Sequence, residues 1–145
     1  MRPLPLLFLI LLATAHAEDR LWSAVVIASN VAKPKDPPAE LKPMVARLKR
    51  LFGCNQFEII GTDVKPVGDG TEQTLQPSPN FSLTLKARHA SVKEARGGYL
   101  LNLELYQDKR ALVDTVAMIA PESPLFFRGP QHARGQILIV LQVLP

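Results

Sequence analysis

From Phe57 onward, the apolar residues of this 145-residue chain recur with a period of two, the spacing expected of strands that bury one face. The clearest example is FSLTLKARHASV, in which apolar residues at 81, 83, 85 and 87 alternate with polar residues. Turn sequences separate the successive runs, namely GDG, KEARGG, QDKR and PESP. The pattern predicts about seven strands, mainly antiparallel and joined by short turns.

A different pattern precedes these strands. Residues 21–30, LWSAVVIASN, form a short run rich in β-branched residues, which predicts a buried first strand. In AELKPMVARLKRLFG the apolar residues are spaced by three and four, which predicts one amphipathic helix that ends at Gly53. Pro43 requires this helix to begin near Glu40, because its missing N–H then falls in the first turn. The predicted apolar stripe consists of Leu41, Met44, Val45, Leu48, Leu51 and Phe52.

Together these elements predict an α+β domain over residues 18–145. We expect a single N-terminal amphipathic helix packed on a mainly antiparallel β-sheet meander, either open or curled towards a barrel or a sandwich. The first strand is expected to pair with a strand that is not its neighbour in sequence. The continuous apolar run at 137–140 predicts a last strand covered on both faces, and Gly61 predicts an irregularity in its strand.

The first 17 residues, MRPLPLLFLILLATAHA, have the pattern of a secretory signal peptide. Arg2 is followed by an apolar run and by the small-x-small ending Ala15-His16-Ala17. The apolar run is too short to span a membrane as a helix, and no later segment comes close. The sequence therefore predicts cleavage near Ala17, a secreted or periplasmic location, and no membrane span in the mature chain.

Charge and cysteine content narrow the possible partners. The chain has 17 Lys and Arg against 13 Asp and Glu, a formal charge of +4. This mild excess is not the clustered basic stripe of a nucleic-acid-binding protein, so we expect no nucleic-acid partner. An anionic polymer of the cell envelope is compatible with it. The only cysteine, Cys54, excludes an intramolecular disulfide; we expect a small buried hydrophobe, with a reactive thiol as the alternative.

Common catalytic motifs are absent from the sequence. It contains no HExxH, GxSxG, SxxK or GxGxxG, so we expect no metal site and no cofactor, and a non-catalytic protein is favoured. The mature chain keeps two histidines, His89 and His132. His89 is expected to be structural, near the end of its strand. A small secreted hydrolase that uses either histidine with an Asp or Glu is the alternative.

One segment gathers basic residues. FFRGPQHARGQILIVLQV places Arg128, His132 and Arg134 in a loop punctuated by Gly129 and Gly135, and Gly135 is expected to adopt a positive φ. Two interpretations are open. The three residues are either the polar tip of a hairpin, or a ligand-binding site in which the two arginines hold an anionic group and His132 is a pH-sensitive donor.

The combination of AVVIASN, the PPAEL helix start, QFEII and a closing P-x-FF-x-GP and G-x-I-L-I-V-L hairpin resembles small uncharacterised secreted proteins of Gram-negative bacteria. The resemblance implies export and an envelope setting, and it carries over no functional residue. The expected topology is also similar to that of cystatin-like domains, in which a helix lies across an antiparallel sheet. The Q-x-V-x-G hairpin of those inhibitors is missing, and fold analogy does not transfer function.

These features predict a non-catalytic exported domain that binds a protein partner or an envelope polymer, as an accessory of envelope assembly. An uncovered sheet edge would allow a partner to add a strand. The alternatives are the small secreted hydrolase and a binder of a small anionic ligand at the Arg128 and Arg134 loop. The identity of the partner and the oligomeric state stay open.

Overall fold

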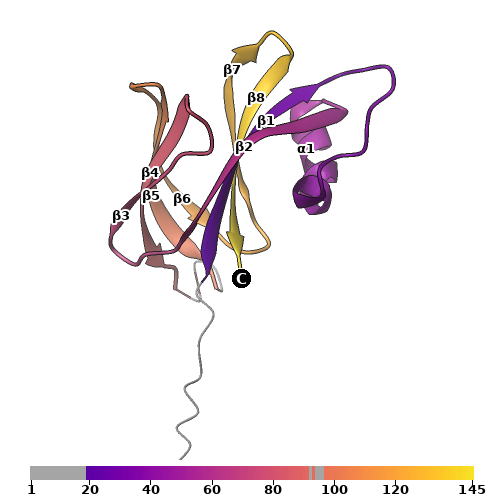
Figure 1. Cartoon of the computed structure of the whole chain (residues 1–145). Helices are drawn as coiled ribbons and strands as arrows, with labels where there is room; N and C mark the ends of the chain where they lie inside the picture. Colours follow the sequence, from indigo (N-terminus) through magenta and orange to yellow (C-terminus); the bar gives the residue numbers. More distant parts are fainter. Residues whose placement is uncertain (1–18, 92, 94–96) are drawn as a thin grey trace, which may run out of the picture.

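The structure is a computed structural model that describes residues 19–91, 93 and 97–145 (Figure 1). The predicted signal peptide, residues 1–17, lies outside the described residues. In chain order the elements are β1 (Arg20–Ser29), the 3₁₀-helix η1 (Ala39–Met44), α1 (Val45–Phe52), β2 (Gln56–Pro66), β3 (Glu72–Leu75), β4 (Phe81–His89), β5 (Tyr99–Gln107), β6 (Arg110–Ile119), β7 (Leu125–His132) and β8 (Gly135–Leu144). The strands that follow the helix match the number expected.

The strands form two antiparallel sheets, one with the order β2-β1-β8-β7 and the other with the order β3-β4-β5-β6. The sheets face each other as a sandwich, and in the described part of the chain they do not close into a barrel (Figure 1). The fold is therefore mainly β, which corrects the expected α+β class built on one meander. β1 pairs with β8, which confirms that the first strand joins a strand far from it in sequence.

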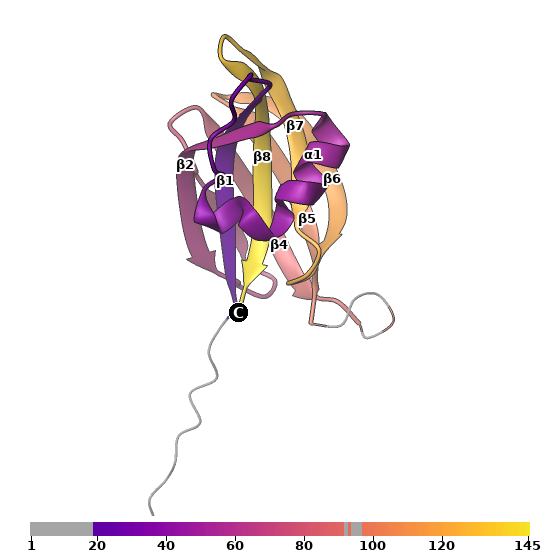
Figure 2. The same cartoon turned by 90° about the vertical axis from the view of Figure 1, so that its right-hand side faces the viewer.

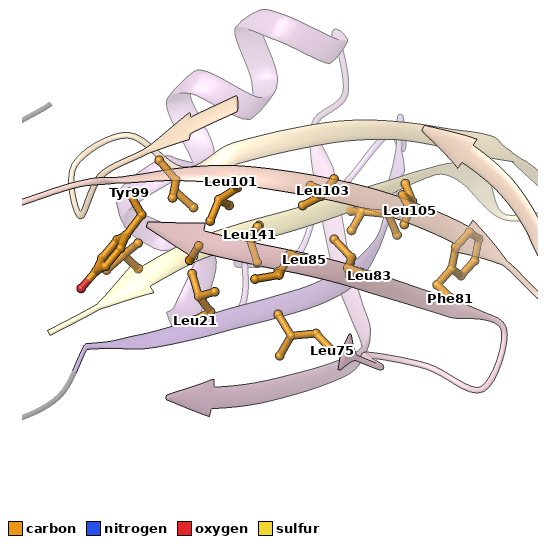
Figure 3. Close-up of a cluster of buried hydrophobic side chains, with 14 of the residues drawn as sticks. Leu21, Leu75, Phe81, Leu83, Leu85, Tyr99, Leu101, Leu103, Leu105 and Leu141 are labelled. Atoms are coloured by element: carbon orange, nitrogen blue, oxygen red, sulfur yellow. The ribbon is translucent and has the colours of Figure 1, made fainter. Parts of the chain in front are cut away.

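The main apolar core fills the space between the two sheets (Figure 3). Its side chains come from the alternating faces of β4 and β5 on one side and from β1 and β8 on the other. Each fully buried leucine contributes about 2 kcal/mol. Members that are at most 1% exposed and labelled in Figure 3 include Leu21, Leu83, Leu85, Leu101, Leu103 and Leu141.

A second apolar cluster lies on the other face of the β2-β1-β8-β7 sheet, beneath the helical segment (Figure 2). Leu41, Met44 and Leu48 pack there against side chains that include Trp22 and Val140. β1 and β8 therefore bury both faces, as the apolar run at 137–140 predicts. A strand that is apolar on both faces needs a cover on each, and the sandwich and the helix supply the two covers.

The helical segment differs from the sequence prediction in two respects. It begins as η1, and regular α-helix starts only at Val45, because Pro43 lacks an N–H and its ring would collide with a carbonyl of the preceding turn. Leu51, expected in the apolar stripe, is 55% exposed. Phe52, which is also part of the expected stripe, is partly buried and meets Phe126 of β7 edge to face, with ring centroids 6.4 Å apart. The helix ends at Gly53 with φ 68°, as predicted.

The expected irregularity at Gly61 is a β-bulge. Val25 lies opposite Gly61 whereas Val26 lies opposite Ile59, so Ile60 is the extra residue. Here β2 passes very close to the connection between β3 and β4, since a Cβ on Gly61 would lie 1.9 Å from the carbonyl oxygen of Pro77.

The β7–β8 hairpin corrects the loop expected at residues 129–135. β7 continues to His132 and β8 begins at Gly135, so only two residues form the turn. A register shift between Arg128 and Gln131 accommodates Gly129 and Pro130, since a bulge is one of the few places where a strand tolerates proline. Gly135 has the expected positive φ, 154°, and a Cβ there would lie 2.3 Å from the carbonyl oxygen of Ala28.

Candidate binding surfaces

Arg128, the first residue of the predicted basic site, lies on β7 and faces the helix. Its guanidinium carbon is 5.4 Å from the centre of the Phe52 ring, which is the geometry of a cation–π contact. The contact arises because Phe126 and Arg128 are two residues apart on one strand and so share the face that carries α1. Arg128 thus already has a partner on the helix.

His132 and Arg134 are neighbours at the tip of the hairpin. The Nδ1 of His132 accepts a hydrogen bond from the backbone N–H of Arg134 at 3.1 Å. One guanidinium nitrogen of Arg134 lies 3.3 Å from both carboxylate oxygens of Glu58 on β2, and both side chains are more than half exposed. The structure therefore brings His132 and Arg134 together and directs Arg128 to a separate contact with Phe52. Both arginines therefore have a partner within the chain, Phe52 for Arg128 and Glu58 for Arg134.

The two histidines lie at opposite ends of the sandwich. His132 is near the end of β1 that contains Ala28, whereas His89 is beside Tyr99, whose hydroxyl reaches Asp19 before the start of β1. His89 is exposed, and its ring lies 4.9 Å from that of Tyr99. The separation excludes a site that uses both histidines, and the ring planes of His89 and Tyr99 are tilted by 38° to each other.

A hollow of about 660 Å³ lies between the β1–η1 connection and β2. Reciprocal 2.9 Å hydrogen bonds between the side chain of Asn55 and the backbone of Val31 hold the connection in place. The charged side chains that line the hollow carry both signs: Lys35, Asp36, Glu40, Glu58 and Arg134. Arg134 pairs with Glu58, which leaves Lys35, Asp36 and Glu40 as the other charged side chains of the lining.

The edge strand β6 carries an exposed apolar surface that the sequence pattern does not predict. Its inward residues, such as Ile119, pack in the sandwich core, whereas Val116 and Met118 point outward and are 60% and 44% exposed. Because residues of both faces of β6 are apolar, sequence alternation alone does not show which face is buried. An edge strand that is apolar on its solvent face is the signal that could have identified this surface.

Two carboxylates lie next to this apolar surface. Glu104 of β5 is directly opposite Asp114 of β6 on the outer face of the β3-β4-β5-β6 sheet, two pairing steps from Val116. The hydroxyl of Tyr106 donates a hydrogen bond to Glu104, and this bond is the main cause that raises the pKa of Tyr106. A surface hollow of about 470 Å³ lies over Glu104 and Asp114 and is lined by residues of β3, β4, β5 and β6.

The structure also bears on a metal site, on a membrane-spanning helix and on the Cys54 thiol. Over residues 19–91, 93 and 97–145, no group of three His, Cys, Asp or Glu side chains could hold a metal ion, and no helix is long and apolar enough to cross a membrane. Cys54 is partly buried against the helix-side cluster, and its thiol contacts the carbonyl of Phe52. A scan against protein-family models and searches of curated proteins and of solved structures found no match to this chain. The candidate surfaces therefore stand on their own geometry.

Proposed function

We propose that this chain is an exported, non-catalytic binding domain that takes up an extended segment of a partner protein on the free edge of β6. Export rests on the signal-peptide pattern of residues 1–17. One observation carries the binding proposal: β6 is a ten-residue edge strand whose outward side chains Val116 and Met118 are largely exposed.

The four outer strands of the two sheets differ in how well they are protected. An edge strand presents unpaired N–H and C=O groups, and proteins usually blunt such an edge by shortness, charge, proline or a cover. β3 has only four residues, and β7 contains Pro130. β2 is hydrogen-bonded to the other sheet: the Lys65 ammonium donates to the carbonyl of Thr74, and the backbone N–H of Gln76 donates to the Asp63 carboxylate. β6 contains no proline, and its only charged residues are Arg110 at its start and Asp114 at its middle. β6 is thus the edge best suited to accept a strand.

The occupant that fits this edge is an extended polypeptide. Its backbone would complete the hydrogen bonds of β6, and every second side chain would lie beside Val116 or Met118. A polysaccharide would leave the ladder of β6 amides and the two apolar side chains unmatched. The same features favour a protein partner over an envelope polymer.

Site-specific photocrosslinking tests the proposal. A benzophenone amino acid replaces Val116 in the full chain, produced in the cells that make the protein, and the matched control replaces Val64. Val64 is 38% exposed and lies on β2, in the other sheet. We expect a specific adduct with another protein from position 116 and none from position 64.

A second change tests whether the adduct depends on the β6 surface. Met118→Lys, combined with the photocrosslinker at position 116, should abolish the adduct, whereas Ile60→Lys on β2 should leave it unchanged. Equal labelling from positions 116 and 64, or no adduct at 116, would overturn the proposal. An adduct between two copies of the chain would also contradict it, because the edge would then serve self-association.

A further inference from the structure

The carboxylates of Glu104 and Asp114 form a like-charge pair on the outer face of the β3-β4-β5-β6 sheet. They are directly opposite one another on β5 and β6, where cross-strand side chains are close neighbours. Like charges in this position are unfavourable unless a cation joins them. The negative charge of the pair is therefore uncompensated unless a neighbouring side chain supplies a cation.

Nothing in the described part of the chain supplies that cation. Neither Glu104 nor Asp114 forms an ion pair with a described residue, and Glu104 instead accepts the hydroxyl hydrogen of Tyr106. The hollow over the pair is lined by Glu72 as well, against one cation, Lys86. Lys86 lies opposite Glu72 on β3 and opposite Asn102 on β5, two pairing steps from Glu104. The region around the pair thus keeps an excess of negative charge.

Asp114 lies on the edge strand itself, so the Glu104–Asp114 pair would lie beside any strand that is added to β6. Asp114, Val116 and Met118 are successive outward residues of β6, so a strand added to this edge places one side chain beside each. One of these side chains would lie over the carboxylate pair and the hollow, and the other two on apolar surface.

We propose that the partner segment carries a lysine or arginine that binds Asp114 and Glu104 and, on one side of it at every second position, two apolar residues that pack on Val116 and Met118. This inference rests on the proposed function of β6 and adds the chemistry of its occupant. A cationic side chain relieves the repulsion between the two carboxylates, and the alternation fixes the register of the added strand.

Two soluble peptides serve as probes, because the natural partner is unidentified. In the first, residues two apart are Lys, Val and Val with threonine between them; in the second, Glu replaces Lys. Each is prepared in both sequence directions, so that a parallel and an antiparallel strand are both represented. Affinity for the purified protein is measured by fluorescence anisotropy at low and high salt.

We expect the Lys peptide to bind at least about fivefold more tightly than the Glu peptide, and the preference to shrink at high salt. Asp114→Asn, which keeps the shape of the side chain and removes its charge, should abolish most of this preference. Glu58→Gln on β2 removes an exposed carboxylate from the other sheet and should leave it unchanged. Met118→Lys should weaken the binding of both peptides.

The outcomes separate this inference from the proposed function. If both peptides bind equally and Met118→Lys weakens both, the edge accepts strands but the carboxylate pair does not select a cation, and the inference is wrong. If the Lys preference is the same in Asp114→Asn, the selection comes from elsewhere and the inference is again wrong. If neither peptide binds while photocrosslinking at position 116 succeeds, the partner lacks the pattern of one cation and two alternating apolar residues, and the inference is wrong while the proposed function stands. If both experiments fail, the proposed function falls as well.

Discussion

Tyr99 buries its ring at the end of the sandwich and donates its hydroxyl hydrogen to Asp19 at 2.5 Å. The backbone carbonyl of Asp19 in turn accepts the N–H of Val67 at 2.9 Å, so the residue just before β1 is tied to two other parts of the chain. Burial, and then the hydrogen bond to Asp19, raise the pKa of Tyr99 above its ordinary value of 10.0. The neutral hydroxyl is therefore part of what stabilises this end of the fold.

Tyr99→Phe should lower the free energy of unfolding by about 1.5 kcal/mol at neutral pH, since it removes a hydrogen bond to a carboxylate. Because the pKa of Tyr99 is raised on folding, its contribution is complete below pH 10.0 and is lost as the pH rises towards the folded-state pKa. Urea denaturation of both proteins should show a difference that shrinks above that pH. A difference that stays constant at high pH would contradict this account.

The ion pair of Arg134 and Glu58 should contribute little to stability. Both side chains are more than half exposed, and exposed pairs are worth about 0.2–1 kcal/mol. A double-mutant cycle with Arg134→Ala and Glu58→Ala should give a coupling free energy below about 1 kcal/mol that falls with added salt. A larger, salt-independent coupling would indicate that the hairpin tip is fixed more firmly than this geometry implies.

These contacts also mark the limit of prediction from sequence at the residue scale. Residue type and neighbours identified Arg128, His132 and Arg134 as a basic group, but Arg134 finds its partner 76 residues away. The contact of Arg128 with Phe52 likewise joins β7 to the helix. Such pairings depend on which strands lie side by side, and local sequence does not encode that information.

At the scale of elements, Gly61 is a position where the backbone itself sets the requirement. A Cβ there would lie 1.9 Å from the carbonyl oxygen of Pro77, so the bulged strand and the following connection would have to separate. Gly61→Ala should therefore destabilise the protein by about 2–3 kcal/mol, whereas Thr62→Ala at the exposed neighbouring position should change stability little. Chemical denaturation of the two variants checks this, and equal effects would contradict it.

Element types were predictable because periodicity reports directly on burial. Strands with one polar and one apolar face, such as β4 and β5, alternate in the sequence as they do in the structure. The length of the β7–β8 turn was harder to predict, because Gly129 and Pro130 are typical of loops as well as of bulges. The free edge of β6 was missed for a related reason: its outward Val116 and Met118 made both of its faces look like core.

At the scale of the whole molecule, the sequence predicted that residues 137–140 are covered on both faces but not what covers them. The covers are the second sheet on one side and the helical segment on the other, and both require the long-range pairing of β1 with β8. A single meander and a two-sheet sandwich contain the same local strands and turns. Only the division of strands between sheets distinguishes them, and it is decided by contacts distant in sequence.

The shared strands lead to a prediction about cooperativity. Successive residues of β1 alternate between the two clusters: Leu21 and Val25 lie in the sandwich core, and Trp22 and Ala24 lie under the helix. Loss of either cluster would expose one face of β1 and β8, so we expect both clusters to unfold in one transition. Trp22, the only tryptophan, reports on the helix side, and far-ultraviolet circular dichroism reports on the sheets.

Leu48→Ala provides the sharpest form of this test. Leu48 is fully buried between the helix and the sheet, so its truncation should cost about 3 kcal/mol. If the fold is one cooperative unit, the urea midpoints from tryptophan fluorescence and from circular dichroism should fall together and by the same amount. If the helical layer can separate from an intact sandwich, the fluorescence midpoint alone should fall, and β1 and β8 would then not couple the two clusters.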